Sequence, residues 1–278
     1  MRHTIVGHKG FIGSALVSQL SRSTPPHDLF LPERSQNLSA EGSLGVVIYC
    51  AGLTADFAQR PFDTMEAHAG YLSHLVCQCD WEQFIYLSST RLYDWTGLAA
   101  VDEATPIVVQ PWQPRSLFDA SKLLGESLVL NARSDRRAMV VRLSTVVNGS
   151  ASDTTFWSQW LRTHVLSAGA SARQSDVCVA SSPEAARDYV FLDDAVMGIL
   201  SLLERGASGI YNLASGVNLS NREVAERIQA AFRVDISFAG SAQVLSPPLV
   251  SIAKMNALFG FSPQGLLQVI DRLASRDG

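Results

Sequence analysis

Apolar and polar positions along the chain follow two alternating patterns. Short, mostly apolar runs bounded by turn residues are typical of buried strands, and they occur at residues 3–7, 28–32, 45–52, 83–89 and 138–144. Apolar positions at helical spacing separate or follow these runs, at residues 12–22, 61–79, 118–133 and 193–205. Strands that alternate with helices predict an α/β fold built on a parallel, doubly wound sheet.

The composition is that of a folded domain that handles small molecules. Of the 278 residues, 47% are hydrophobic and 17% are charged, which is enough for one large domain or for a domain with a smaller lobe. The net charge of -4 provides no basic surface for a phosphate polymer, so we expect no nucleic-acid partner. We expect neither a membrane segment nor a signal peptide, because no apolar run has the required length or flanks.

The four cysteines, Cys50, Cys77, Cys79 and Cys178, lack the paired spacing of a disulfide framework. We therefore expect reduced thiols and a cytoplasmic location. Cys77 and Cys79 form a CxC pair, but no second pair of ligands lies near them in the sequence. We accordingly predict no metal site.

Three glycines, Gly7, Gly10 and Gly13, follow the first predicted strand in the stretch GHKGFIG at 7–13. Glycines at this spacing let the backbone turn tightly, let a pyrophosphate approach the helix N-terminus and let the helix pack on the strand. The alternative is a tight turn without a ligand. The position of the glycine stretch, directly after the first strand of an alternating sheet, favours a dinucleotide site.

The second predicted strand leads to the residues that choose the cofactor. Glu33 stands twenty residues beyond Gly13, where a carboxylate accepts hydrogen bonds from the adenosine ribose and repels a 2'-phosphate. This favours NAD. Arg34 could instead pair with the 2'-phosphate of NADP, and a solvated Glu-Arg pair on a loop is the interpretation without a ligand.

Further motifs give the chain a resemblance to a known family. Besides GHKGFIG these are CAG at 50–52, SSTRLY at 88–93, the SK of FDASK at 118–122 and RDYVFLDD at 187–194. In order and spacing they resemble the extended branch of the short-chain dehydrogenase/reductase superfamily, which holds NAD(P)-dependent nucleotide-sugar epimerases, dehydratases and reductases similar to UDP-galactose 4-epimerase. The resemblance covers nearly the whole chain.

The resemblance implies an architecture. We expect a Rossmann-type dinucleotide-binding domain from residues 1–149 with 187–206, and a small substrate-binding lobe from 150–186 with 207–278. Only about a dozen residues separate the second and third predicted strands, so the helix and strand that the superfamily usually has there are expected to be shortened or missing.

The matched motifs also imply cofactor contacts. The residues that would wrap the pyrophosphate are Gly7, Gly10, Phe11, Ile12 and Gly13. Those that would lie on the adenosine side of the cofactor are Ala51 and Gly52, with Glu33 and Arg34 at the ribose. Lys122 matches the lysine that holds the nicotinamide ribose and favours the ionised form of a catalytic tyrosine.

On the substrate side, Ser89 matches the catalytic serine whose hydroxyl bonds the reacting sugar oxygen. Thr54 and Thr90 lie where the sugar or its phosphate would be contacted, and Thr145 stands where the family usually has an asparagine directed at the nucleotide phosphates. Arg187 matches the arginine that pairs with the nucleotide diphosphate. The alternative for Arg187 is a surface ion pair with Asp188.

Phe118 occupies the position of the family's catalytic tyrosine. Hydride leaves a sugar carbon only as the attached hydroxyl loses its proton, so a base must touch that oxygen in the transition state, and phenylalanine has none. Three explanations remain open, in our order of preference. They are a deliberate substitution that removes one oxygen, a natural relative that only binds, and a proton acceptor elsewhere, with Thr90, Tyr93 or a water held by Ser89 as candidates.

The sequence therefore predicts an NAD(P)-dependent epimerase- or dehydratase-type oxidoreductase that acts on a nucleotide sugar by transient hydride transfer. A keto-sugar or carbonyl reductase that consumes NADPH is the alternative enzyme, and a non-catalytic cofactor-binding protein is the alternative outside the enzymes. From the resemblance alone we expect a homodimer, paired through the helices at about 61–79 and 118–133.

Overall fold

The structure of the protein is a computed structural model. It describes residues 2–23, 27–53, 56–131, 133, 135–148, 177–232, 234–240 and 246–275. Part of the predicted substrate-binding lobe, up to residue 176, lies outside these ranges, as does the candidate substrate contact Thr54. None of the helices in the described ranges is both long and apolar enough to cross a membrane.

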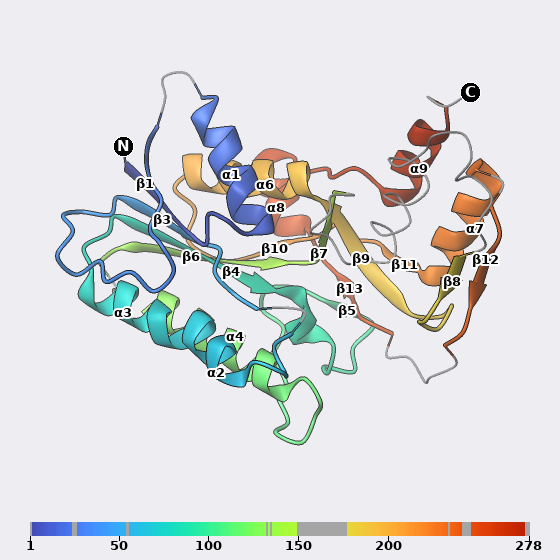
Figure 1. The fold of residues 1–278 in the computed structure, drawn as a ribbon, viewed down its shortest axis with the longest axis horizontal. Helices are drawn as coiled ribbons and strands as arrows, with labels where there is room; N and C mark the ends of the chain where they lie inside the picture. The colour runs from blue at the N-terminus through green and yellow to red at the C-terminus, as the bar shows by residue number, and fades with distance from the viewer. Residues whose placement is uncertain are drawn as a thin grey trace.

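Six parallel strands form a large sheet at the centre of the fold (Figure 1), in the order β10-β6-β4-β3-β1-β2. They are β1 (Arg2–Val6), β2 (Asp28–Phe30), β3 (Val46–Tyr49), β4 (Gln83–Ser89), β6 (Arg137–Leu143) and β10 (Gly209–Leu213). β1, β3, β4 and β6 are buried over nearly their whole length, as expected for parallel strands covered on both faces.

Helices cover both faces of this sheet. On one face lie α1 (Phe11–Ser21) and α6 (Leu192–Glu204), which pack against each other. On the other face, α2 (Pro61–Met65), the π-helical turn η1 (Glu66–Gly70) and α3 (Tyr71–Gln78) form one continuous helix beside α4 (Ser116–Asn131). Apolar side chains from the sheet fill both interfaces. The predicted α/β class with a doubly wound parallel sheet is confirmed, and each predicted strand and helix is present within three residues of its expected ends.

The connection from β2 to β3 is short. Residues 31–45 contain no helix or strand, and β2 forms one edge of the sheet. The prediction of a shortened connection between the second and third strands is therefore confirmed.

A second group of elements packs beyond the carboxyl ends of the large sheet. β7 (Thr145–Val147), β9 (Ala186–Phe191) and β11 (Asn218–Ser220) form a three-stranded sheet, and β8 (Val177–Val179) pairs with β12 (Ile236–Phe238). α7 (Asn221–Phe232) packs against α9 (Leu266–Ala274), and a third apolar cluster lies among these elements. The other short elements are η2 (Thr90–Tyr93), β5 (Ala100–Val101) paired with β13 (Leu249–Val250), and α8 (Ala253–Phe259).

The strand pairing differs from the predicted division of the chain at two points. β10 lies within 207–278, which we expected in the lobe, yet it pairs with β6 at the edge of the large sheet. β9 begins the range 187–206, which we expected in the dinucleotide-binding domain, yet it pairs with β7 and β11 outside that sheet. The predicted division came from the family resemblance, and sequence motifs do not show which sheet a strand joins.

Candidate active site

The turn between β1 and α1 packs three glycines closely together. Gly7 has a φ of 82°, and a Cβ on Gly13 would lie 2.3 Å from the carbonyl oxygen of Gly7. The amide of Gly10 donates a hydrogen bond to the same oxygen (2.9 Å). Phe11 and Ile12 then begin α1 with their side chains half-buried against the core. Among the described residues, no side chain caps this helix, so its first N–H groups can receive an anion.

A cavity of about 340 Å³ opens beside this turn and is also lined by residues 32–35, 49–53, Glu66, Ala67 and Tyr71. Glu33 lies at its mouth and accepts hydrogen bonds from Lys9 (2.7 Å), which lower the pKa of its carboxyl group. Arg34 pairs instead with Asp63 (3.3 Å). Glu33 and Arg34 therefore do not form the solvated pair considered above; the partner of Glu33, Lys9, is exposed, and the partner of Arg34, Asp63, is half-buried.

A buried histidine supports the floor of the site. The Nε2 of His68 accepts a hydrogen bond from the amide of Leu53 (3.2 Å), and its Nδ1 lies 2.8 Å from the hydroxyl of Ser121. Burial, followed by the positive charge of Lys122, lowers the pKa of His68 to about 3. The ring is neutral, and because Nε2 accepts, Nδ1 carries the proton and donates to Ser121.

The sequence motifs did not single out His68, which lies against the candidate catalytic helix. The π-helical turn η1 places it there, and such turns often occur at functional sites. A Cβ on Gly52 would lie 3.1 Å from its Nε2 and 3.3 Å from the Nζ of Lys122. Gly52 is therefore the point where the loop after β3 meets both side chains.

Phe118 lies on the first turns of α4 and is 1% exposed. Its ring packs against the rings of Phe57 and His68, each with a centroid separation of 5.5 Å. Its carbonyl oxygen accepts a hydrogen bond from Ser121 (3.0 Å). The position of the expected tyrosine is thus filled by an apolar ring that is covered on two sides by aromatic neighbours.

Lys122 lies one helical turn after Phe118, and its amine is buried. The amine donates a hydrogen bond to the carbonyl oxygen of Leu87 on β4 (2.9 Å) and lies 4.9 Å from the ring centroid of Tyr86. Burial lowers the pKa of Lys122 to about 8, although the carboxylate of Glu126 opposes the change. Such a cation responds strongly to any charge that a ligand brings.

Ser89 ends β4, directly before η2. Its hydroxyl oxygen accepts a hydrogen bond from the amide of Arg91 (3.2 Å), which caps η2. The hydroxyl of Thr90 is directed into the fold and donates to the carbonyl oxygen of Leu143 (3.4 Å). Because α4 packs on β4 and on η2, the serine lies at the strand end beside the helix that carries Phe118 and Lys122.

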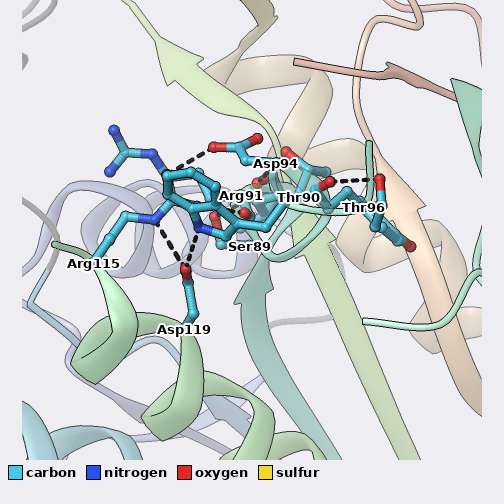
Figure 2. A network of polar contacts seen from close by, with 10 residues as sticks. Ser89, Thr90, Arg91, Asp94, Thr96, Arg115 and Asp119 are labelled. Atoms are coloured by element: carbon cyan, nitrogen blue, oxygen red, sulfur yellow. Dashed lines mark hydrogen bonds and ion pairs between the residues drawn. The ribbon is translucent and has the colours of Figure 1, made fainter. Parts of the chain in front are cut away.

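Figure 2 shows a polar network that fixes this strand end against α4. Arg115 donates to Asp119 (3.0 Å), to Asp94 (2.7 Å) and to the carbonyl oxygen of Arg91 (2.6 Å). The indole of Trp95 donates to Asp119 (3.1 Å). Sequence reasoning missed this network; its one local signal is the four-residue spacing of Arg115 and Asp119 at a helix start.

Comparison with known proteins assigns the sequence to one family. The sequence profile of the NAD dependent epimerase/dehydratase family matches residues 3–214, which include the glycine turn, β4 and α4. The chain belongs to this family. This match confirms the resemblance to the extended short-chain dehydrogenases, and the family consists of enzymes. No curated protein sequence matches the chain significantly.

Solved structures of similar fold span the whole chain at low sequence identity. MoeE5 in complex with UDP-glucose and NAD has a TM-score of 0.79 and 19% identity, covering 100% of this chain and 99% of its own. RMD from Pseudomonas aeruginosa, complexed with NADPH, has a TM-score of 0.77 and 22% identity, with the same coverage. A tyrosine-to-phenylalanine mutant of UDP-glucuronic acid 4-epimerase from Bacillus cereus, bound to UDP-4-deoxy-4-fluoro-glucuronic acid and NAD, has a TM-score of 0.80 and 17% identity, covering 99% and 97%.

Two of the substrate contacts expected in this family lie on the strands beyond the large sheet. Thr145 begins β7 and is half-buried, and Arg187 lies exposed on β9. Arg187 does not pair with Asp188, whose carboxylate oxygens accept from the amides of Ser215 and Gly216 (2.8 Å each). The ion pair considered as an alternative for Arg187 is therefore wrong, because Asp188 is buried and bonded to the backbone.

Tyr93, considered above as another proton acceptor, is part of a buried network. Its hydroxyl donates to Asn212 (2.8 Å) and accepts from Arg142 (2.7 Å), and Arg142 in turn forms a double hydrogen bond with the buried Glu126. Burial raises the pKa of Tyr93. The phenol is fully engaged inside the protein, so it does not serve this member of the family as a base toward a substrate.

Proposed function

We propose that the chain binds NAD(P) across the carboxyl edge of the large sheet and acts on a nucleotide sugar by hydride transfer beside Ser89 and Lys122. One observation carries the proposal. The cavity that begins at the glycine turn runs along the loop after β3 to Gly52, where the buried amine of Lys122 lies. Helix α4, which carries Lys122, also carries Phe118 at the position of the family's tyrosine.

The residues at the cavity suit a dinucleotide. At the glycine turn a Cβ would meet backbone atoms, and this tight turn is the kind that lets a pyrophosphate approach the start of a helix. Glu33 beside the cavity can accept hydrogen bonds from ribose hydroxyls once Lys9 moves aside. This favours NAD. Lys9 and Arg34 are two cations beside the same mouth, which supports NADP as the second choice. The bound coenzyme would supply the hydride acceptor and donor, while Lys122 would hold its ribose.

Phe118 deprives the site of a base that could accept the proton of a sugar hydroxyl. The hydroxyl of Ser89 can orient a sugar oxygen, but no oxygen at position 118 can accept its proton, and the loss of a general base typically costs about 10²- to 10⁴-fold in rate. We infer a site that binds cofactor and substrate and transfers hydride slowly. The covered ring of Phe118, packed by Phe57 and His68, supports the second candidate function, a relative that binds without catalysis.

The variant Phe118→Tyr separates the two functions. Both chains are loaded with NAD or NADPH, supplied with a UDP-sugar, and followed by the absorbance of the reduced nicotinamide and by NMR of the sugar. We expect hydride transfer to rise about 10²- to 10⁴-fold and to fall again in the double variant Phe118→Tyr/Ser89→Ala, the matched control. Hydride transfer at background in both chains, with cofactor binding retained, would leave only the binding function.

We further propose a homodimer that pairs through α2 and α4. These two helices contact each other on one face of the sheet, and they present Phe62, Met65 and Leu124 with exposed fractions of 77%, 38% and 45%. A second copy would bury these side chains. In sedimentation experiments we expect the unmodified chain to be a dimer and the Leu124→Asp variant to be a monomer.

The protein's cysteines support a cytoplasmic location, because Cys50, Cys77, Cys79 and Cys178 are free thiols.

A further inference from the structure

We propose that Arg91 binds an anionic group of the substrate, together with Arg187. This inference rests on the proposed function and names the group that the substrate must carry at this end of the site. The group is an oxyanion with two or more oxygens, either the diphosphate of a nucleotide or a carboxylate on the sugar.

The backbone of Arg91 is held firmly, but its side chain has no partner among the residues that the structure describes. Its amide donates to the hydroxyl of Ser89 (3.2 Å), and its carbonyl oxygen accepts from Arg115 (2.6 Å). Within the described residues its guanidinium group forms neither a hydrogen bond nor an ion pair, although the side chain is half-buried.

The acidic side chains near Arg91 are already in use. The carboxylates of Asp94 and Asp119 face this region, but both are bonded to Arg115, and Asp119 also accepts from Trp95. A planar guanidinium offers five donors in a fixed fork. Within the described part of the chain, the network therefore fixes the base of Arg91 and leaves its five donors unoccupied.

Arg187 brings a second positive charge to the same place. The pairing of β4, β6, β7 and β9 connects the two residues, because Ser89 lies opposite Leu143 and Thr145 lies opposite Tyr189. Burial lowers the pKa of Arg91, and the nearby charges of Arg187 and then Arg115 lower it further. Two neighbouring cations repel each other, so an anion between them relieves the cost of placing both there.

Carboxylate and phosphoryl groups match this pair of donors. Both accept two hydrogen bonds from one guanidinium in a parallel arrangement, and hydrogen bonds between charged groups are stronger than neutral ones. Arg91 follows Ser89 by two residues and its amide donates to the Ser89 hydroxyl, so the arginine is anchored next to the residue that would orient the sugar oxygen. A neutral sugar without a diphosphate would offer neither arginine a charged partner.

Isothermal titration of the NADH-loaded protein tests this inference. The probes are UDP-glucuronic acid, UDP-glucose, UDP and inorganic pyrophosphate, applied to the unmodified chain, Arg91→Gln, Arg187→Gln and the control Arg22→Gln. Arg22 is exposed and directly follows the last residue of α1. We expect Arg91→Gln to weaken UDP-glucuronic acid about 10- to 100-fold, Arg187→Gln to act in the same direction, and Arg22→Gln to change the affinity less than about twofold.

The pattern over the probes identifies the anion. Equal losses for all three uridine ligands assign it to the diphosphate, whereas a loss confined to UDP-glucuronic acid assigns it to the carboxylate. If pyrophosphate binding depends on Arg91 while the nucleotide sugars bind no chain, the proposed substrate class fails and the anion site stands. Unchanged affinity of every probe in a folded Arg91→Gln, or no binding of any probe to the unmodified chain, overturns the inference.

Discussion

Replacing the buried lysine with an isosteric apolar side chain, Lys122→Met, should stabilise the protein while damaging its site. Lys122 is 4% exposed, and among the described residues its amine donates a hydrogen bond only to a neutral group, the carbonyl oxygen of Leu87. A charged amine in this position has lost most of its hydration. Methionine has a similar shape and needs no hydration, so it removes this penalty.

The size of the penalty follows from the pKa of Lys122. Burial lowers it from 10.5 to about 8, and at about 1.4 kcal/mol per pKa unit the folded state loses about 3 kcal/mol at pH 7. The loss of the hydrogen bond to Leu87 offsets about 1 kcal/mol. We therefore expect Lys122→Met to raise the free energy of unfolding by about 2 kcal/mol at pH 7, with weaker cofactor binding.

The same pKa predicts how this difference changes with pH. Between pH 8 and 10.5 the folded protein releases the proton of Lys122 before the unfolded chain does, so the unmodified protein becomes more stable relative to the variant. The advantage of Lys122→Met should shrink by about 3 kcal/mol over this interval. Other groups that titrate there are common to both proteins and cancel in the difference.

Urea unfolding at pH 7 and at pH 10 measures both effects. The matched control is Lys254→Met, since the amine of Lys254 also donates to a carbonyl oxygen, that of Ile210, but lies in an exposed residue. We expect the control to change stability by less than about 1 kcal/mol at either pH. A Lys122→Met protein that is less stable than the unmodified chain at pH 7, or a pH-independent difference, would refute this reasoning.

Three further changes have defined outcomes. Gly13→Ala places a Cβ 2.3 Å from a backbone oxygen of the glycine turn, whereas nothing lies within 4 Å of a Cβ on Gly42; NADH fluorescence should show lost binding for Gly13→Ala and normal binding for Gly42→Ala. Glu126→Gln breaks a buried ion pair and should cost about 3 to 5 kcal/mol in urea unfolding, while Glu184→Gln, in an exposed pair, should cost less than about 1 kcal/mol. The unfolded histidine takes up a proton near pH 6.5 but folded His68 only near pH 3, so thermal stability should fall as the pH drops below 6.5, and His68→Gln should flatten that slope.

The sequence was most informative where a local rule leaves little choice. The glycine turn could be located because only glycine tolerates the φ of Gly7 and the contact at Gly13. Helix α4 and its buried Lys122 followed from apolar spacing and a family motif. The short connection before β3 followed from counting residues. These features depend on neighbours in the chain or on steric limits, which a sequence displays directly.

The sequence was least informative where partners come from distant segments. His68 is separated from Ser121 by 53 residues, and its role needs the π-helical turn, which has no recognisable sequence pattern. The network of Arg115 joins α4 to η2 across a long loop. Likewise, β10 joins the large sheet rather than the lobe because of pairing with β6. Each of these depends on tertiary packing rather than on local preference.

The wide turn η1 has a consequence for how this protein can vary. A π-helical turn contains one residue more than the α-helical turn it replaces, so substitutions alone cannot remove it, while a single-residue deletion between 66 and 70 can. Such a deletion would restore α-helical spacing between α2 and α3 and change the local backbone that positions His68 beside Ser121. Insertions and deletions at residues 66–70 are thus the genetic changes that can alter the placement of His68 while the rest of the helix keeps its packing.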